Sequence, residues 1–155
     1  MNLRFVLLFH MLCPLFFIGQ NQNPVSWSAV YTETNDNEGI ISITASIQPA
    51  WHIYSQRPTE AGPIPTSFTF TPGNNFELLE KTQEENAKEE FVKAFDAKVF
   101  VFTGKAVFKQ RVKRLNTKKF IAPLALEYMT CNDMMCLPPK TVELSINVPA
   151  VAIKK

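Results

Sequence analysis

The sequence is poor in the residues that most ligand-binding and catalytic sites require. It has 2 histidines and 5 glycines in 155 residues, and its formal net charge is only +2. The glycines are few and scattered, so no phosphate-binding loop is predicted. A nearly neutral chain offers no basic surface for nucleic acid or for an anionic membrane. His52 is the single histidine beyond residue 20; we therefore predict no zinc site, no other cofactor and no small-molecule substrate.

The first 20 residues have the pattern of a secretory signal peptide. Arg4 is the one charge in this segment, and an apolar stretch runs from Phe5 to Ile18. This stretch is shorter than the ~20 apolar residues of a membrane span, and polar residues follow it. We expect residues 1–20 to be removed on export and residues 21–155 to form one periplasmic or secreted domain. If the segment is retained, it anchors the domain to the membrane.

Short segments with alternating apolar and polar residues predict an all-β fold. The clearest is the last, where Val142, Leu144, Ile146 and Val148 alternate with polar neighbours. Several such strands separated by turns indicate a β-sandwich. The segment from 80 to 93 is highly charged and is predicted to be a short helix or a solvated loop. The predicted strands cover residues 25–31, 40–47, 67–71, 98–103, 105–112, 124–130 and 141–148.

Two cysteines remain once the first 20 residues, with Cys13, are set aside. Cys131 and Cys136 would be joined in an oxidising compartment. An extended chain would hold their Cα atoms ~16 Å apart, whereas a disulfide needs roughly 4.4–6.8 Å. The chain must therefore turn back through residues 132–135, where Asn132 and Asp133 favour a turn. The cysteines are thus predicted to lie in a turn that another protein can reach.

The residues by themselves leave three interpretations of this pair open. A redox-active pair exchanges its disulfide with other proteins. A structural staple that closes so short a loop would stabilise the fold by ~2 kcal/mol. A third possibility is a Cu(I) site, because Met129, Met134 and Met135 add soft sulfur ligands to the two thiols.

Two blocks of the sequence resemble one protein family. Tyr128 stands three residues before Cys131, and the double proline Pro138-Pro139 follows Cys136. A second block contains the run Trp51-His52-Ile53-Tyr54-Ser55 and a proline-rich turn over residues 62–68. Together they resemble the periplasmic N-terminal domain of the thiol:disulfide interchange protein DsbD.

This resemblance implies an immunoglobulin-like β-sandwich that relays reducing equivalents. Cys136 would form mixed disulfides with partners, and Cys131 would resolve them. The implied partners are thioredoxin-like redox proteins and disulfide isomerases, including those of cytochrome c maturation. No membrane region or thioredoxin-like domain follows Val148, so a membrane reductase would donate electrons in trans. If the pair is active, the domain is a protein-disulfide reductase-type carrier; the alternative is a non-redox secreted interaction module with a structural disulfide.

The sequence also departs from the family pattern near the site. Four residues separate the cysteines, where well-studied members have five. The family shields its pair with a cap loop that bears acidic residues and an aromatic, and the corresponding stretch here is predicted at residues 93–97. Phe95 is either the covering aromatic or an ordinary core residue, and no acidic pair directly precedes it. Trp51, Tyr54 and Tyr128 are expected to line the cysteine pocket.

Overall fold

The computed structural model describes residues 23–59, 62–93 and 95–151. In these ranges the chain forms strands and no helix, which confirms the predicted all-β fold. None of the described residues belongs to a helix that could cross a membrane. The residues of the predicted signal peptide lie outside these ranges. The strands are β1 (Val25–Glu33), β2 (Glu38–Ile47), β3 (His52–Tyr54), β4 (Ser67–Phe70), β5 (Phe76–Glu84), β6 (Lys88–Val92), β7 (Ala97–Thr103), β8 (Lys105–Arg114), β9 (Phe120–Tyr128), β10 (Thr130–Cys131) and β11 (Lys140–Val148).

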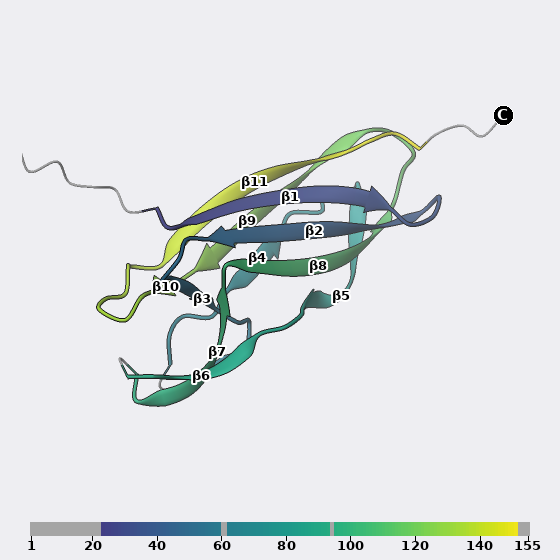
Figure 1. Ribbon diagram of the computed structural model, residues 1–155. Helices are drawn as coiled ribbons and strands as arrows, with labels where there is room; N and C mark the ends of the chain where they lie inside the picture. Colours follow the sequence, from purple (N-terminus) through teal and green to yellow (C-terminus); the bar gives the residue numbers. More distant parts are fainter. Residues whose placement is uncertain (1–22, 60–61, 94, 152–155) are drawn as a thin grey trace, which may run out of the picture.

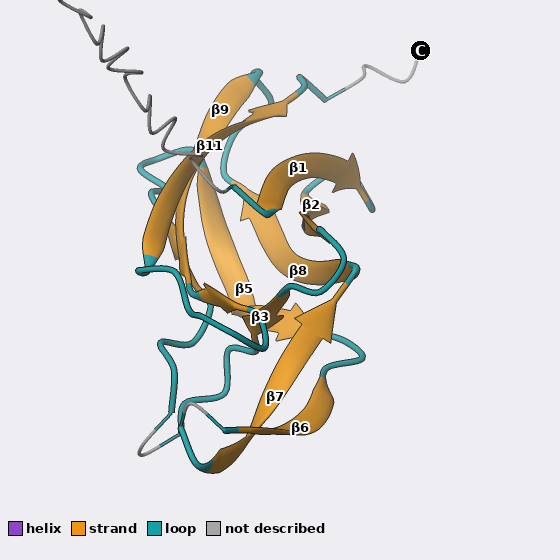
Figure 2. Ribbon diagram, turned by 60° about the vertical axis from the view of Figure 1, so that its left-hand side comes forward, coloured by secondary structure: helices purple, strands orange, loops and turns teal. Residues whose placement is uncertain are grey.

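The strands form three antiparallel sheets that wrap around one interior (Figures 1 and 2). The first sheet has the order β1-β2-β8-β5, and the third has the order β11-β9-β4. The ring of Phe68 on β4 contacts that of Phe108 on β8, and Tyr128 on β9 contacts Trp27 on β1, so these two sheets face each other as the layers of a sandwich. Strands β1 and β11 lie side by side at one edge (Figure 1). The second sheet, with the order β10-β3-β7-β6, covers one end of the sandwich.

The period of two along the long strands builds the interior. In β2 and β8 every second side chain is buried, as Ile41 and Ile43 illustrate, and β9 contributes Leu124 and Leu126. Phe108 lies at the centre, with its ring centroid 4.8 Å from that of Phe68, 5.3 Å from that of Phe102 and 6.0 Å from that of Trp27. Burying each large apolar side chain contributes roughly 1.5–3 kcal/mol. We call this cluster of buried residues the main core.

The two faces of the short strand pair β3–β7 pack in different clusters. Ile53 and Phe102 are direct cross-strand neighbours, and both belong to the main core. The next pair, Tyr54 and Val101, points to the opposite face because side chains alternate along a strand. There Tyr54, Val99, Val101 and Cys131 form a second, smaller cluster, which we call the cysteine cluster. The second sheet therefore separates the cysteines from the main core.

The charged segment over residues 80–93 was expected to be a helix or a solvated loop, and that expectation is wrong. It contains the end of β5 and all of β6. Strand β5 pairs with β8 through an irregularity between Leu79 and Gln83, next to Glu80, which has a positive φ of 66°. Both strands lie at the edge of a sheet. Charged side chains at such edges discourage pairing with other chains, so a charge-rich sequence here is compatible with strands.

Candidate functional site

The cysteines lie at the two ends of a tight hairpin turn. Cys131 and Cys136 form a disulfide, and their Cα atoms are 4.0 Å apart. The Leu137 amide donates to the Thr130 carbonyl at 2.9 Å, which closes the chain around the pair. The two prolines that follow precede β11, which begins at Lys140. The predicted turn-back of the chain is therefore confirmed, and the prolines lie outside the strand ladder.

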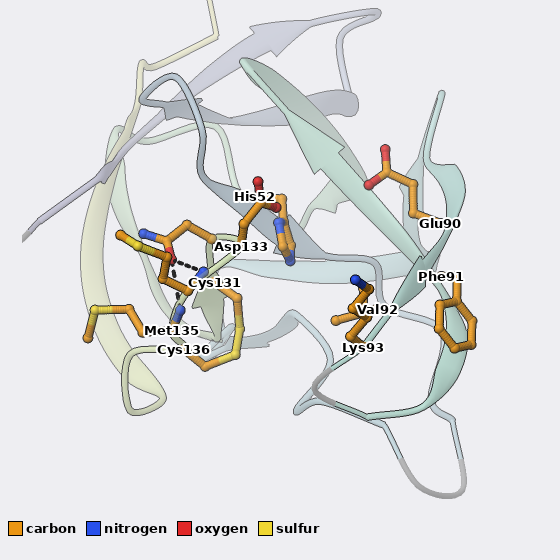
Figure 3. A pocket seen from close by; sticks show the side chains of 11 residues that line it. His52, Glu90, Phe91, Val92, Lys93, Cys131, Asp133, Met135 and Cys136 are labelled. Carbon is orange, nitrogen blue, oxygen red and sulfur yellow. Dashed lines mark hydrogen bonds between the residues drawn. A yellow bond between two sulfur atoms is a disulfide. The ribbon is translucent and has the colours of Figure 1, made fainter.

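Asn132 organises the interior of this turn. Its amide donates to the Met135 carbonyl at 2.9 Å. Its side-chain Oδ1 accepts hydrogen bonds from the amides of Met134 at 2.9 Å and Met135 at 2.8 Å (Figure 3). This is the local chemistry that makes asparagine a good turn residue, because its side chain satisfies backbone donors that would otherwise need water.

The two sulfurs differ in their access to solvent. Cys131 continues β10, pairs with β3 and is 1% exposed. Cys136 is partly exposed, and Met134 at the tip of the turn is 89% exposed. Cys136 is therefore the more accessible cysteine of the pair. Met135 is 46% exposed, whereas Met129 packs against the cysteine cluster.

A groove of about 670 Å³ opens beside the disulfide. Its walls come from three places far apart in the sequence: the start of β3, the end of β6 and the cysteine turn (Figure 3). The lining residues carry carboxylates, an imidazole, an ammonium group, apolar side chains and both sulfurs. They are His52, Glu90, Phe91, Val92, Lys93, Asn132, Asp133, Met134, Met135 and the two cysteines.

His52 occupies the middle of the groove, between the cysteine turn and β6 (Figure 3). It is the direct cross-strand neighbour of Cys131. Its Nε2 lies 3.0 Å from the Tyr54 hydroxyl, and the two rings meet edge to face. Burial lowers the pKa of His52 from its ordinary value, and the carboxylates of Glu90 and Asp133 oppose that shift. Burial also raises the pKa of Tyr54 to about 12, so its hydroxyl stays protonated at neutral pH.

Phe95 lies over the cysteine cluster. It follows β6, and its amide donates to the Val92 carbonyl at 3.1 Å, which turns the chain into β7. Its ring is edge-to-face with that of Tyr54 at a centroid distance of 6.0 Å. Phe95 and Cys136 are both partly buried against the same cluster. The structure thus brings Phe95 and Tyr54, both singled out from the sequence, to the cysteines.

Trp51 and Tyr128 have different surroundings. Tyr128 is buried in the main core, where its ring lies 5.3 Å from that of Trp27. Trp51 packs against the same core from the loop before β3. Neither is among the described residues that line the groove. Both residues pack beneath the sheet that carries the cysteines, and they do not line the groove beside the disulfide.

Sequence reasoning missed four groups of the groove: His52, Glu90, Phe91 and Asp133. The signal for two of them was present, because the acidic pair absent before Phe95 occurs as Glu89-Glu90 directly before Phe91. That run was assigned to a solvated charged face. In the described ranges, no group of three or more histidine, cysteine, aspartate or glutamate residues could hold a metal ion.

These features define a class of protein: a β-sandwich domain whose disulfide lies in a surface turn beside a groove. The chain belongs to the family described as the N-terminal region of the thiol:disulfide interchange protein DsbD, which matches residues 21–147. The predicted family is therefore confirmed, and the fold is the immunoglobulin-like sandwich of that family. No curated protein matches the sequence.

Two solved structures have a similar fold. The reduced DsbD N-terminal domain of Neisseria meningitidis is 16% identical, with a TM-score of 0.53; the match covers 81% of this chain and 86% of that one. The N-terminal periplasmic domain of ScsB from Proteus mirabilis is 18% identical, with a TM-score of 0.52; the match covers 83% of this chain and 48% of that one. At this level of identity the likeness concerns the fold.

Proposed function

We propose that this domain exchanges the Cys131–Cys136 disulfide with thioredoxin-like proteins in the periplasm. In this function it takes electrons from a membrane reductase in trans and passes them to disulfide isomerases or to thioredoxins of cytochrome c maturation. The observation that carries the proposal is the location of the disulfide in a surface turn, with Cys136 as the more exposed cysteine. Family membership and the signal-like residues 1–20 support a periplasmic location.

The reduction of the domain is a two-step exchange. A thiolate of the donor attacks Sγ of Cys136, the Cys131–Cys136 bond breaks, and the sulfur of Cys131 leaves with the electron pair. The donor's second thiolate then attacks the donor sulfur that is bonded to Cys136, and Cys136 leaves as a thiolate. The donor becomes a disulfide, and the domain gains two electrons and two protons. Delivery of electrons to an acceptor runs through the same steps in reverse.

Access explains why the two cysteines would have different roles. Attack on a disulfide requires an approach in line with the S–S bond, and only the sulfur with open space on its outer side permits it. Cys136 is the more exposed residue of the pair, whereas Cys131 is 1% exposed and packs against Tyr54 and Val101. Glu90 and Phe91 on β6 line the groove beside the pair, but the Phe91 ring points away from the disulfide (Figure 3).

Trapping of a covalent partner tests this proposal. In a Cys131→Ala variant, Cys136 attacks the partner's disulfide and the resulting mixed disulfide cannot be resolved, so a covalent complex with a thioredoxin-like protein should accumulate on non-reducing gels. The matched Cys136→Ala variant keeps only the buried thiol and should capture at least tenfold less. Equal capture by both variants would contradict the assigned roles.

The reduction potential of the pair gives a second, independent test. A redox carrier should reach equilibrium with glutathione or thioredoxin buffers and should have a reduction potential within the range of known periplasmic exchange proteins. A potential well below about −300 mV would identify the bond as a structural staple. The function would then be that of a secreted binding module, and the proposal would fail.

A further inference from the structure

His52 is the one imidazole of the described chain, and it stands beside the cysteine that is closed off from water. We propose that His52 is the general base that takes the proton from the Cys131 thiol when Cys131 resolves a mixed disulfide. This inference rests on the exchange function proposed above. It gives that function a proton acceptor, which the cysteine pair alone lacks.

The strand pairing brings the two side chains together. Cys131 and His52 are direct partners in the antiparallel pair β10–β3. Directly opposite residues project to the same face of a sheet, with Cβ atoms about 4.5–5.5 Å apart. Both side chains line the groove (Figure 3). His52 is therefore the base closest to Cys131 in the sheet register.

Cys131 needs such a neighbour because of its surroundings. It packs against Tyr54, Val99 and Val101 and is 1% exposed. A thiol in apolar surroundings resists ionisation, yet only the thiolate is a nucleophile. Water and solvent bases have little access to its proton. Cys136, which is partly exposed, does not share this difficulty.

The other ionisable groups around His52 suit supporting roles. Tyr54, on the same strand, keeps its proton at neutral pH because its pKa is about 12, so it cannot act as the base. Its hydroxyl contacts Nε2 and holds the ring, which leaves Nδ1 for proton exchange. Glu90 from β6 and Asp133 from the turn are exposed carboxylates that favour a positive charge on the ring. Lys93, after β6, is exposed and disfavours that charge.

The opposing effects of burial and of the nearby carboxylates suit a histidine that is neutral at rest and carries a proton only briefly. Burial keeps the ring neutral at pH 7, which is the form that accepts a proton. The carboxylates of Glu90 and Asp133 then stabilise the imidazolium that forms.

The step balances as follows. In the mixed disulfide, Cys136 is bonded to a sulfur of the partner, and Cys131 is a thiol. His52 removes the proton from Cys131, and the thiolate attacks Sγ of Cys136. The Cys131–Cys136 bond forms while the bond from Cys136 to the partner breaks. The electron pair leaves with the partner's sulfur, which takes a proton from water, and the imidazolium returns its proton to water.

A chromogenic disulfide separates the two stages of this reaction. When the reduced domain reacts with an equimolar amount of 5,5′-dithiobis(2-nitrobenzoate), attack by Cys136 releases the first thionitrobenzoate, and resolution by Cys131 releases the second. In a His52→Gln variant the first phase should stay within twofold of the wild-type rate. The second phase should slow by about 100-fold at pH 7, the low end of the range for a general base.

The difference between the two proteins should shrink as the pH rises, because hydroxide then ionises Cys131 without help. A Thr103→Val variant is the matched control, since Thr103 flanks His52 on the β7 side and is exposed. It should leave both phases unchanged. Equal slowing of both phases by His52→Gln, or a slowing that persists at pH 10, would indicate a structural role and overturn the inference.

The wild-type domain provides a measurement that does not depend on a variant's folding. The rate of its second phase should rise with pH and level off at an apparent pKa below 6.5, the ordinary value for histidine. A rate that keeps rising tenfold per pH unit through pH 9 would contradict a role for His52. A wild-type domain that releases no thionitrobenzoate in either phase would instead refute the exchange function itself.

Discussion

One face of the β3–β7 strand pair closes the main core, whereas the opposite face carries the cysteine cluster. Ile53 and Phe102 on the inner face belong to the main core, which contains residues from all three sheets. Tyr54 and Val101 on the outer face belong to the smaller cluster, against which Cys136, Val92 and Phe95 pack. A disulfide that reacts with other proteins must lie near the surface, whereas a stable domain needs a large buried core. The two faces of this one sheet meet these two requirements.

The largest effect on stability is expected in the main core. A Phe108→Ala variant should lower the free energy of unfolding by about 3–5 kcal/mol, because the aromatic side chain is fully buried and leaves a cavity. Urea denaturation of the oxidised protein measures this loss. Phe91→Ala removes the same ring from a site that is 58% exposed and should change stability by about 0.5 kcal/mol or less. Similar losses in both variants would refute the contrast between the main core and the exposed edge strand β6.

Removal of the disulfide should have a smaller effect. A Cys131→Ala, Cys136→Ala double variant should lose about 2 kcal/mol, the value expected for closing so short a loop. Urea denaturation of oxidised wild type and of the double variant gives the difference. A loss as large as that of Phe108→Ala would mean that the pair is a staple on which the fold depends.

The exposed tip of the turn should matter for partners and not for stability. A Met134→Ser variant removes an apolar side chain that is 89% exposed, so the free energy of unfolding should be unchanged. Exchange with a thioredoxin-like protein should slow about threefold to tenfold, because apolar contact area at the interface is lost. Exchange with a small aromatic disulfide should not change.

Val30→Ser is the matched control for this variant. Val30 is 60% exposed on β1, in a different sheet from the cysteines. Its substitution should leave both exchange rates at the wild-type value. If Val30→Ser slowed exchange with the protein partner as much as Met134→Ser, the turn would not be the contact surface.

The smallest effect should be the pH dependence that His52 adds to stability. The folded domain lowers the pKa of His52, so the unfolded chain binds a proton at a higher pH than the folded one does. The free energy of unfolding is therefore unaffected by the protonation of His52 above about pH 6.5, and it falls as the pH drops through the pKa of His52 in the folded domain. Denaturation at pH 7.5 and pH 5 should show a smaller decline for His52→Gln than for wild type. An identical decline would contradict the shift.

Local sequence patterns were enough for most of the strands and for the cysteine turn. The alternation in residues 141–148 matches the burial pattern of β11. The turn through Asn132 follows from chain geometry and from asparagine chemistry, which need no distant partner. The charged residues 80–93 misled the prediction because edge strands carry charge for a reason that local composition does not reveal.

The pocket around the cysteines depended on distant segments. Glu90 and Phe91 on β6, His52 on β3 and the cysteine turn meet only because β10, β3, β7 and β6 are adjacent in one sheet. A period of two tells which side chains share a face, yet it does not tell which face meets the core. For this reason Tyr128 and Tyr54 were assigned alike to the pocket, although the structure buries Tyr128 in the main core.

The sequence by itself determined an all-β domain of the DsbD N-terminal family with a cysteine pair in a turn. It did so through periodicity, turn chemistry and the spacing of a few specific residues, all of which act over short distances along the chain. Only the tertiary structure decided that Cys131 is buried, that Cys136 is partly exposed and that His52 stands beside them. Those properties depend on the register between strands about 80 residues apart, which long-range packing sets.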